Sequence, residues 1–282
     1  MVAIFGDKGY LGGELAYYLR SKGVPFDGFD RESDVTTNEF WQEFNPRKYS
    51  TIYYLSGLTG TEVGFTQADK FLIVNELGLL NLLSAIIDVP YENRPKIIFP
   101  STRLVYKGSN NVLSEDAEKE TKTPYAVNKL ACEGYLAAFS NRYGINYSVL
   151  RICVPYGSLR EGSSYSYGTL GFFKREIDAG RPITLYGGGL QRRTFTHVHD
   201  ICVAFEKLSQ STLKSVVCNI GGEDFSLREV AEKFIEKYGG EIVDAPWPEI
   251  DRKLESGSTV FDDSLLRSLT DWKTTRQLVE CL

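Results

Sequence analysis

The 282-residue sequence contains few sulfur-bearing residues and little histidine, with five cysteines, one methionine and two histidines. The cysteines are scattered without a close pair, which argues against a disulfide scaffold or a cysteine metal cage. His197 and His199 form an H-x-H pair, but two ligands without a third do not make a metal site, so we predict no metal. This cysteine usage fits a reducing compartment, and we expect the protein to be cytoplasmic.

An excess of positive charge is also missing. The 32 basic and 37 acidic residues give a net charge of −5, which offers no reason to expect nucleic acid or an anionic membrane surface as a partner. No uninterrupted apolar run approaches the roughly 20 residues of a membrane helix, and no basic segment of a signal peptide precedes the first apolar run. With 42% hydrophobic and 24% charged residues, the chain has the composition of an ordinary globular protein.

The first fifteen residues, MVAIFGDKGYLGGEL, form the most informative stretch of the sequence. An apolar run suited to a buried strand is followed by Gly6, Gly9 and Gly12 and then by a segment with helical spacing of leucines. A strand, a glycine-rich turn and a helix in this order are typical of a dinucleotide site, where the pyrophosphate lies on the helix N-terminus. We therefore predict that Gly6, Gly9, Tyr10, Leu11 and Gly12 bind the cofactor.

The choice between NAD and NADP depends on three residues. Asp30 stands near the end of the predicted second strand, where an acid usually binds the adenosine ribose hydroxyls and repels a 2′-phosphate. Lys8 and Arg31 favour the opposite choice, because either cation could bind that phosphate. We predict NAD(P), with NAD slightly favoured.

Strand-like and helix-like segments alternate through the rest of the first half, which predicts an α/β fold with a doubly wound parallel sheet of the Rossmann type. Ser56 follows the predicted strand 51–55 and is expected near the cofactor. Asn75, inside a predicted helix over 71–87, is either an anchor for a loop or an exposed residue. The Gly-, Ser- and Tyr-rich segment 156–171 is interpreted as a mobile loop over a ligand.

Tyr125 and Lys129 lie one helical turn apart, in a predicted helix over 125–142 that comes after the strand leading to Ser101 and Thr102. The same spacing recurs at Tyr18 and Lys22, so spacing alone is weak support. The chemistry is more informative: a neighbouring ammonium lowers the pKa of a phenol towards the range useful for proton transfer. A Ser or Thr hydroxyl would bind the same substrate oxygen while a hydride moves to or from a nicotinamide.

The chain resembles the extended short-chain dehydrogenase/reductase family of nucleotide-sugar epimerases, dehydratases and reductases. The matching segments are Gly6-x-x-Gly9-x-x-Gly12, NELGLLNLL at 75–83, STRLVY at 101–106, Tyr125-x-x-x-Lys129, RICVPYG at 151–157, PITLYGGG at 182–189, RTFTHVHD at 193–200 and NIGG at 219–222.

The resemblance implies roles for individual residues. Thr102 would supply the catalytic hydroxyl, Tyr125 would be the general acid and base, and Lys129 would bind the nicotinamide ribose. Arg193 resembles the arginine that binds the diphosphate of the sugar nucleotide, and Arg252 would do likewise.

The resemblance also implies an organisation of the chain. Residues 1–157 and about 194–224 would form the NAD(P)-binding domain. Residues from about 158–193 and 225–282 would form a smaller, mainly C-terminal region that binds the nucleotide sugar. The predicted helices over 71–87 and 125–142 are those that family members pair across an interface, so a homodimer is expected.

Departures from the family pattern narrow the set of reactions that the chain is expected to catalyse. Dehydratases carry Asp-Glu directly after the catalytic Thr, whereas this chain has Arg103 and Leu104. GDP-fucose synthases carry Cys at the position of Leu104. The remaining chemistry needs only the Thr, Tyr and Lys, and we predict a C4 epimerase acting through a keto intermediate. The alternative is a reductase of 4-keto sugars. A non-catalytic dinucleotide-binding protein is less favoured, because such proteins tend to lose the Tyr/Lys pair that is present here.

Overall fold

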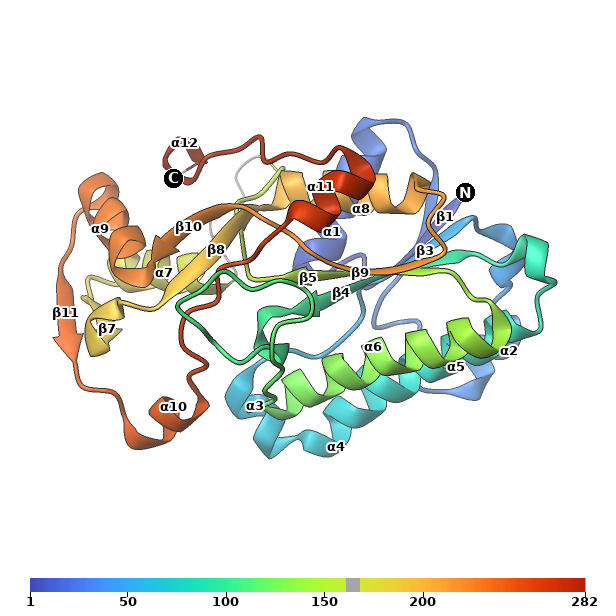
Figure 1. Cartoon of the computed structure of the whole chain (residues 1–282), viewed down its shortest axis with the longest axis horizontal. Helices are drawn as coiled ribbons and strands as arrows, with labels where there is room; N and C mark the ends of the chain where they lie inside the picture. Colours follow the sequence, from blue (N-terminus) through green and yellow to red (C-terminus); the bar gives the residue numbers. More distant parts are fainter. Residues whose placement is uncertain (161–167, 282) are drawn as a thin grey trace.

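In the computed structural model, which describes residues 1–160 and 168–281, a six-stranded parallel sheet forms the centre of the larger part (Figure 1). The strand order is β2-β1-β3-β4-β5-β9, and each neighbouring pair is parallel. The strands are β1 (Val2–Phe5), β2 (Phe26–Phe29), β3 (Thr51–Tyr54), β4 (Lys96–Thr102), β5 (Tyr147–Ile152) and β9 (Ser215–Asn219). The predicted doubly wound parallel sheet is thereby confirmed.

The strand order contains a switch point beside β1. The chain leaves β1 to one side for β2 and returns to pair β3 on the other side of β1. Connections that diverge in this way open a crevice beyond the carboxyl ends of the strands, which is where parallel sheets bind ligands. The glycine-rich turn lies at this crevice, because it follows β1 directly.

Helices cover both faces of this sheet (Figure 1). One face packs against α1 (Tyr10–Ser21), α8 (Val198–Gln210) and α11 (Ser264–Thr270), and the other against α2 (Asn38–Glu43), α5 (Gly78–Ile87) and α6 (Pro124–Tyr143). In α8 the buried residues Ile201, Phe205 and Leu208 recur at helical spacing, so that one stripe of the helix meets the sheet. The packing of α8 thus follows from its amphipathic sequence pattern.

A smaller lobe lies at the other end of the molecule, on the left of Figure 1. It contains a three-stranded sheet in the order β10-β8-β6 and a two-stranded sheet of β11 and β7, with α7 and α9 packed on a third apolar cluster. Its elements are β6 (Val154–Tyr156), α7 (Gly168–Asp178), β7 (Ile183–Tyr186), β8 (Arg192–His197), β10 (Glu223–Ser226), α9 (Leu227–Tyr238), β11 (Ile242–Ala245), α10 (Glu249–Leu254) and α12 (Leu278–Cys281). A capping box formed by Ser226 and Glu229 begins α9.

The segment between β3 and β4 is mostly helical, with a break at Gln67. It consists of α3 (Thr61–Thr66), α4 (Ala68–Phe71), a π-helical turn η2 (Leu72–Leu77) and α5. The part from Ala68 to Ile87 is long and apolar enough to cross a membrane by length and composition, which the search for uninterrupted apolar runs missed. Its Leu79, Leu83 and Ile86 are fully buried against the sheet, as in a core helix.

Two sequence predictions differ from the structure in their bounds or lie partly outside it. The strand expected to lead to Ser101 and Thr102 includes both residues, because β4 pairs with β5 up to the register Thr102–Ile152. Of the predicted loop 156–171, residues 161–167 lie outside the described residues, so that interpretation stays a prediction. Short 3-10 turns complete the fold at η1 (Pro46–Lys48), η3 (Tyr91–Asn93), η4 (Arg103–Val105) and η5 (Gly187–Gly189).

Candidate active site

The glycine-rich turn packs too closely for side chains at two of its positions. Gly6 has a φ of +82°, a conformation that residues with a Cβ rarely adopt. A Cβ at Gly12 would lie 1.9 Å from the carbonyl oxygen of Gly6, so the first turn of α1 fits against β1 only without one. The N-terminal end of α1, with the amides of Leu11 and Gly12, is therefore brought close to the end of β1, where helix geometry leaves such amides without intrahelical acceptors.

A cleft of about 800 Å³ begins at this turn and runs along the carboxyl ends of β1, β3, β4 and β5. Most of the predicted site residues line it: Gly6, Gly9, Tyr10, Leu11, Gly12, Arg31, Thr102, Tyr125 and Lys129. Lys8, Asp30, Ser56, Asn75, Arg193 and Arg252 are not among the residues that line it. The structure therefore brings the predicted cofactor turn and the predicted catalytic trio to one cavity.

Acidic groups cluster around the turn at the end of β2. Asp30 accepts a hydrogen bond from the backbone N–H of Lys8 at 2.9 Å, and the Lys8 ammonium pairs with Glu32 at 2.5 Å. Burial, and next the charge of Asp30, raise the pKa of the Asp7 carboxyl. Arg31 is the one cation of this group that lines the cleft in the described chain. The three carboxylates outnumber the two cations here.

Asn75 holds the loop that follows β3. Its side chain is buried, accepts from the N–H of Leu58 at 2.7 Å and donates to the carbonyl of Leu58 at 3.1 Å. Of the two alternatives from the sequence, Asn75 is therefore the loop anchor. Ser56 lies in the same loop, with its backbone N–H against Gly6, while its neighbours Leu55 and Gly57 line the cleft.

Thr102 presents its hydroxyl at the end of β4. The oxygen caps the turn η4 by accepting from the N–H of Leu104 at 3.3 Å, which leaves the hydroxyl proton available for a ligand oxygen. Ser101, next to it, is engaged elsewhere, because its hydroxyl donates to Glu133 at 2.6 Å in a buried contact. Of the two hydroxyls that the sequence placed at this strand end, Thr102 is the one suited to chemistry.

Tyr125 and Lys129 lie on the first turns of α6, which begins at Pro124 behind the capping residue Thr123. The Lys129 ammonium is buried, donates to the carbonyl of Pro100 at 2.8 Å and lies 5.9 Å from the centre of the Tyr125 ring. Burial lowers the pKa of Lys129 to about 8. The lysine is thus mostly charged at neutral pH and close enough to favour the phenolate of Tyr125.

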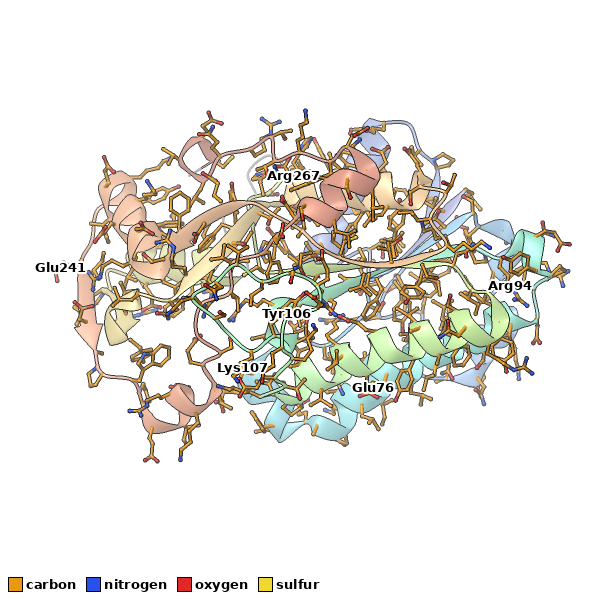
Figure 2. The ribbon with its side chains drawn as sticks, in the orientation of Figure 1. Glu76, Arg94, Tyr106, Lys107, Glu241 and Arg267 are labelled. Carbon is orange, nitrogen blue, oxygen red and sulfur yellow. The ribbon has the colours of Figure 1, made fainter. Side chains whose placement is uncertain are left out.

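Two buried polar networks hold this helix and the strand ends in place. Glu76, labelled in Figure 2, accepts from Asn128 at 2.5 Å and from Tyr135 at 3.0 Å, which ties η2 to α6. Tyr106, labelled near the centre of Figure 2, donates to Asn219 at 2.7 Å and accepts from Arg151 at 2.6 Å. Such satisfied networks fix the positions of the elements that carry the site.

The two arginines predicted to bind a diphosphate lie in different settings. Arg193 is 2% exposed and pairs with Glu255 at 2.5 Å, whereas Arg252 is exposed on α10. Sequence reasoning missed Arg103 as a site residue, although it lines the cleft directly after Thr102. Its position at the exit of a predicted strand was the available signal.

The described residues fit a dinucleotide. The turn with Gly6 and Gly12 forms a cradle that a Cβ would fill, and the amides at the N-terminus of α1 suit a pyrophosphate. Beyond it, a phenol, an ammonium and a hydroxyl converge on one cavity. This arrangement can move a proton at a substrate oxygen beside a bound nicotinamide.

Comparisons with known proteins agree with this geometry. The model of the family described as "NAD dependent epimerase/dehydratase family" matches residues 2–221. The mouse dTDP-D-glucose 4,6-dehydratase is 27% identical over 68% of this chain, but the chain spans only 53% of that relative's length. The UDP-glucuronate 4-epimerase of Thermodesulfobacterium geofontis is 22% identical over 96% of this chain and 90% of its own.

Solved structures resemble the whole chain. The structure of MoeE5 in complex with UDP-glucose and NAD is 26% identical, with a TM-score of 0.81 over 99% of this chain and 95% of the other. The chain therefore spans about half the length of the curated relatives that it matches first and nearly the full length of this solved structure.

Proposed function

The chain belongs to the NAD dependent epimerase/dehydratase family, and we propose that within this family it is a UDP-sugar 4-epimerase that retains NAD. The family contains nucleotide-sugar epimerases, dehydratases and decarboxylases, so an enzyme of the oxidoreductase type is expected. The proposal of a UDP sugar draws on MoeE5 with UDP-glucose and NAD and on the similarity to a UDP-glucuronate 4-epimerase.

One observation carries the proposal: Thr102, Tyr125 and Lys129 line the same cleft as the glycine-rich turn. NAD, when bound, supplies a hydride acceptor that can return the hydride. Tyr125 takes the proton from the sugar O4 and gives it back, and Thr102 donates a hydrogen bond to the same oxygen. The Lys129 ammonium, 5.9 Å from the centre of the Tyr125 ring, favours the charged form of that phenol.

The residues after Thr102 argue against loss of water as the reaction. A dehydration needs an acid and a base beside the sugar in addition to the Tyr, and Arg103 and Leu104 stand there instead. An arginine is always protonated and a leucine has no proton to exchange. The trio alone suffices for oxidation and reduction at one carbon.

A 4-keto-sugar reductase using NADPH is the second candidate, because Arg31 lines the cleft near the adenosine end. The charges around it favour NAD. Asp7, Asp30 and Glu32 would repel a 2′-phosphate, and Lys8 is already paired with Glu32. We therefore propose NAD as the cofactor, retained through a full catalytic cycle in the cytoplasm.

We further propose a homodimer that pairs the helices around η2 and α6. Large apolar side chains are exposed there in the single chain: Leu72, Ile73 and Leu77 on η2, Val63 and Phe65 on α3, and Val127 on α6, each between 40% and 54% exposed. A second copy would bury this apolar surface. Sedimentation analysis of the protein and of Leu72→Glu tests this, since the variant is expected to be monomeric.

The activity is tested by incubating the purified protein with UDP-glucose or UDP-glucuronate and following the 4-epimer by NMR. We expect conversion without added cofactor, and a loss of about 100-fold or more in Tyr125→Phe, the range that acid–base catalysis contributes. Tyr143→Phe, on the exposed end of the same helix, is the matched control and should turn over normally. Unchanged turnover in Tyr125→Phe would overturn the proposal.

A further inference from the structure

Arg103 lies in the wall of the cleft and follows directly on the residue that carries the proposed catalytic hydroxyl. It follows Thr102 in the chain, opens the turn η4 and lines the cavity. Its Nη1 donates to the hydroxyl of Ser256 at 3.0 Å, in the segment that leads away from α10. This position is fixed by β4 at one end and by that segment at the other.

The charges around Arg103 do not cancel. Arg193 lies close by and is neutralised by Glu255 at 2.5 Å, with a further hydrogen bond to the carbonyl of Gly257. The titratable groups that act on Arg103 are Arg193, Cys153 and Glu255, and among the described residues no carboxylate forms an ion pair with it. The buried guanidinium of Arg193 and the half-buried one of Arg103 therefore share one carboxylate.

The pKa of Arg103 agrees with this excess of two guanidinium groups over one carboxylate. Burial lowers the pKa of the Arg103 guanidinium to about 10, and the charge of Arg193 lowers it further than Glu255 raises it. A buried cation that lacks a full partner is unfavourable and is stabilised by an anion at hydrogen-bonding distance. The site thus has the charge of an incomplete ion pair that a ligand would complete.

The place of Arg103 limits what that anion can be. Because Arg103 is the chain neighbour of Thr102, its guanidinium is within one side-chain length of the hydroxyl that binds the reacting sugar oxygen. An anionic group on the sugar ring itself comes within this reach. A carboxylate suits the planar guanidinium, which can bind both of its oxygens.

Resting on the proposed function, we propose that Arg103 binds a carboxylate on the sugar ring, so that the substrate is a UDP-hexuronate rather than a neutral UDP-hexose. A hydroxymethyl group in the same place leaves the guanidinium without an anion, and a neutral hexose is then disfavoured. Arg103 would be a specificity-determining residue that the sequence pattern of the trio does not include.

The test compares two nucleotide sugars that differ only at this group, with UDP as a third ligand that lacks the sugar. Binding of UDP-glucuronate, UDP-glucose and UDP is measured by calorimetry on the purified holoenzyme and on Arg103→Met, which keeps the length of the side chain and removes its charge. We expect the wild type to prefer UDP-glucuronate by about tenfold or more, the size of one charge-assisted hydrogen-bonded contact. Arg103→Met should lose about 10- to 100-fold of the uronate affinity and less than about threefold for UDP-glucose and UDP.

Arg267→Met is the matched control, because Arg267, labelled in Figure 2, is an exposed arginine on α11 outside the cleft lining. It should bind all three ligands like the wild type. Equal losses for UDP-glucuronate, UDP-glucose and UDP in Arg103→Met would overturn the proposal, because they would assign Arg103 to the diphosphate or to a tether for Ser256. Absence of a preference in the wild type would also overturn it. Binding of no UDP ligand by the wild type would instead contradict the proposed function itself.

Discussion

Replacing Gly12 by alanine is expected to separate the first turn of α1 from β1 and to weaken NAD binding. The added Cβ would lie 1.9 Å from the carbonyl oxygen of Gly6, about 1.6 Å closer than the roughly 3.5 Å at which such atoms pack. The nearest atoms are backbone atoms of Gly6 and Asp7, so no side chain can rotate away to make room. The helix end must therefore move, and the amides that face the pyrophosphate move with it.

The size of the effect follows from overpacking. Inserting a methyl group into a close contact costs about 1–3 kcal/mol, and this corresponds to a fall of roughly 2–12 °C in melting temperature for a chain of this size. The NAD affinity should fall by about tenfold or more, because charge-assisted hydrogen bonds to the pyrophosphate lengthen together.

Gly13→Ala is the matched control one residue further along the same helix. Its Cβ would meet the Asp7 carbonyl oxygen at 3.4 Å and Arg160 at 3.5 Å, which are ordinary contacts. Alanine is the better helix former by about 0.5–1 kcal/mol, so this variant should be slightly more stable and bind NAD normally. Thermal unfolding and NAD titration of both variants check the prediction. If Gly12→Ala binds NAD like the wild type, the close approach is not what the site requires.

Three further perturbations test other parts of the site. Turnover should fall above about pH 8, where Lys129 loses its charge and no longer favours the phenolate of Tyr125; a pH–rate profile that is flat from pH 7 to 10 would contradict this role. Asp30→Ala should weaken NAD and strengthen NADP binding, measured by titration with both dinucleotides; a variant that still excludes NADP would show that Asp30 does not set the preference. Asn75→Ala should lower the free energy of unfolding by about 1–3 kcal/mol and weaken NAD binding, because the backbone groups of Leu58 lose their partners. Chemical denaturation measures the first effect and NAD titration the second. Wild-type values in both would refute the anchoring role.

Local patterns predicted the parallel sheet and its flanking helices, because apolar runs and helical spacing of apolar residues indicate strands and helices. The apolar run before Gly6 is β1, and the leucines after Gly12 lie on α1. These signals depend on residues within one or two turns of each other. The strand order β2-β1-β3-β4-β5-β9 pairs segments that are far apart in the chain, and local patterns do not contain it.

Features that depend on distant contacts were less accessible. Nothing near Asn75 in the sequence shows that its amide binds the backbone of Leu58. The pairing of Arg193 with Glu255 joins residues 62 positions apart, and the diphosphate role expected for that arginine stays a prediction. From the sequence, Arg103 was interpreted only as a residue that stands where dehydratases have an Asp. The charges that act on Arg103 come from three separate segments of the chain, which local patterns do not bring together.

The transfer of the C4 hydrogen tests the central proposal most directly. UDP-glucose and UDP-glucuronate deuterated at C4 are incubated with the purified protein without added cofactor, and the products are analysed by mass spectrometry and NMR. The proposal predicts a 4-epimer that keeps the deuterium at C4, because the same hydride leaves and returns within one site. Loss of the deuterium to solvent, or no epimer from either sugar, would contradict it.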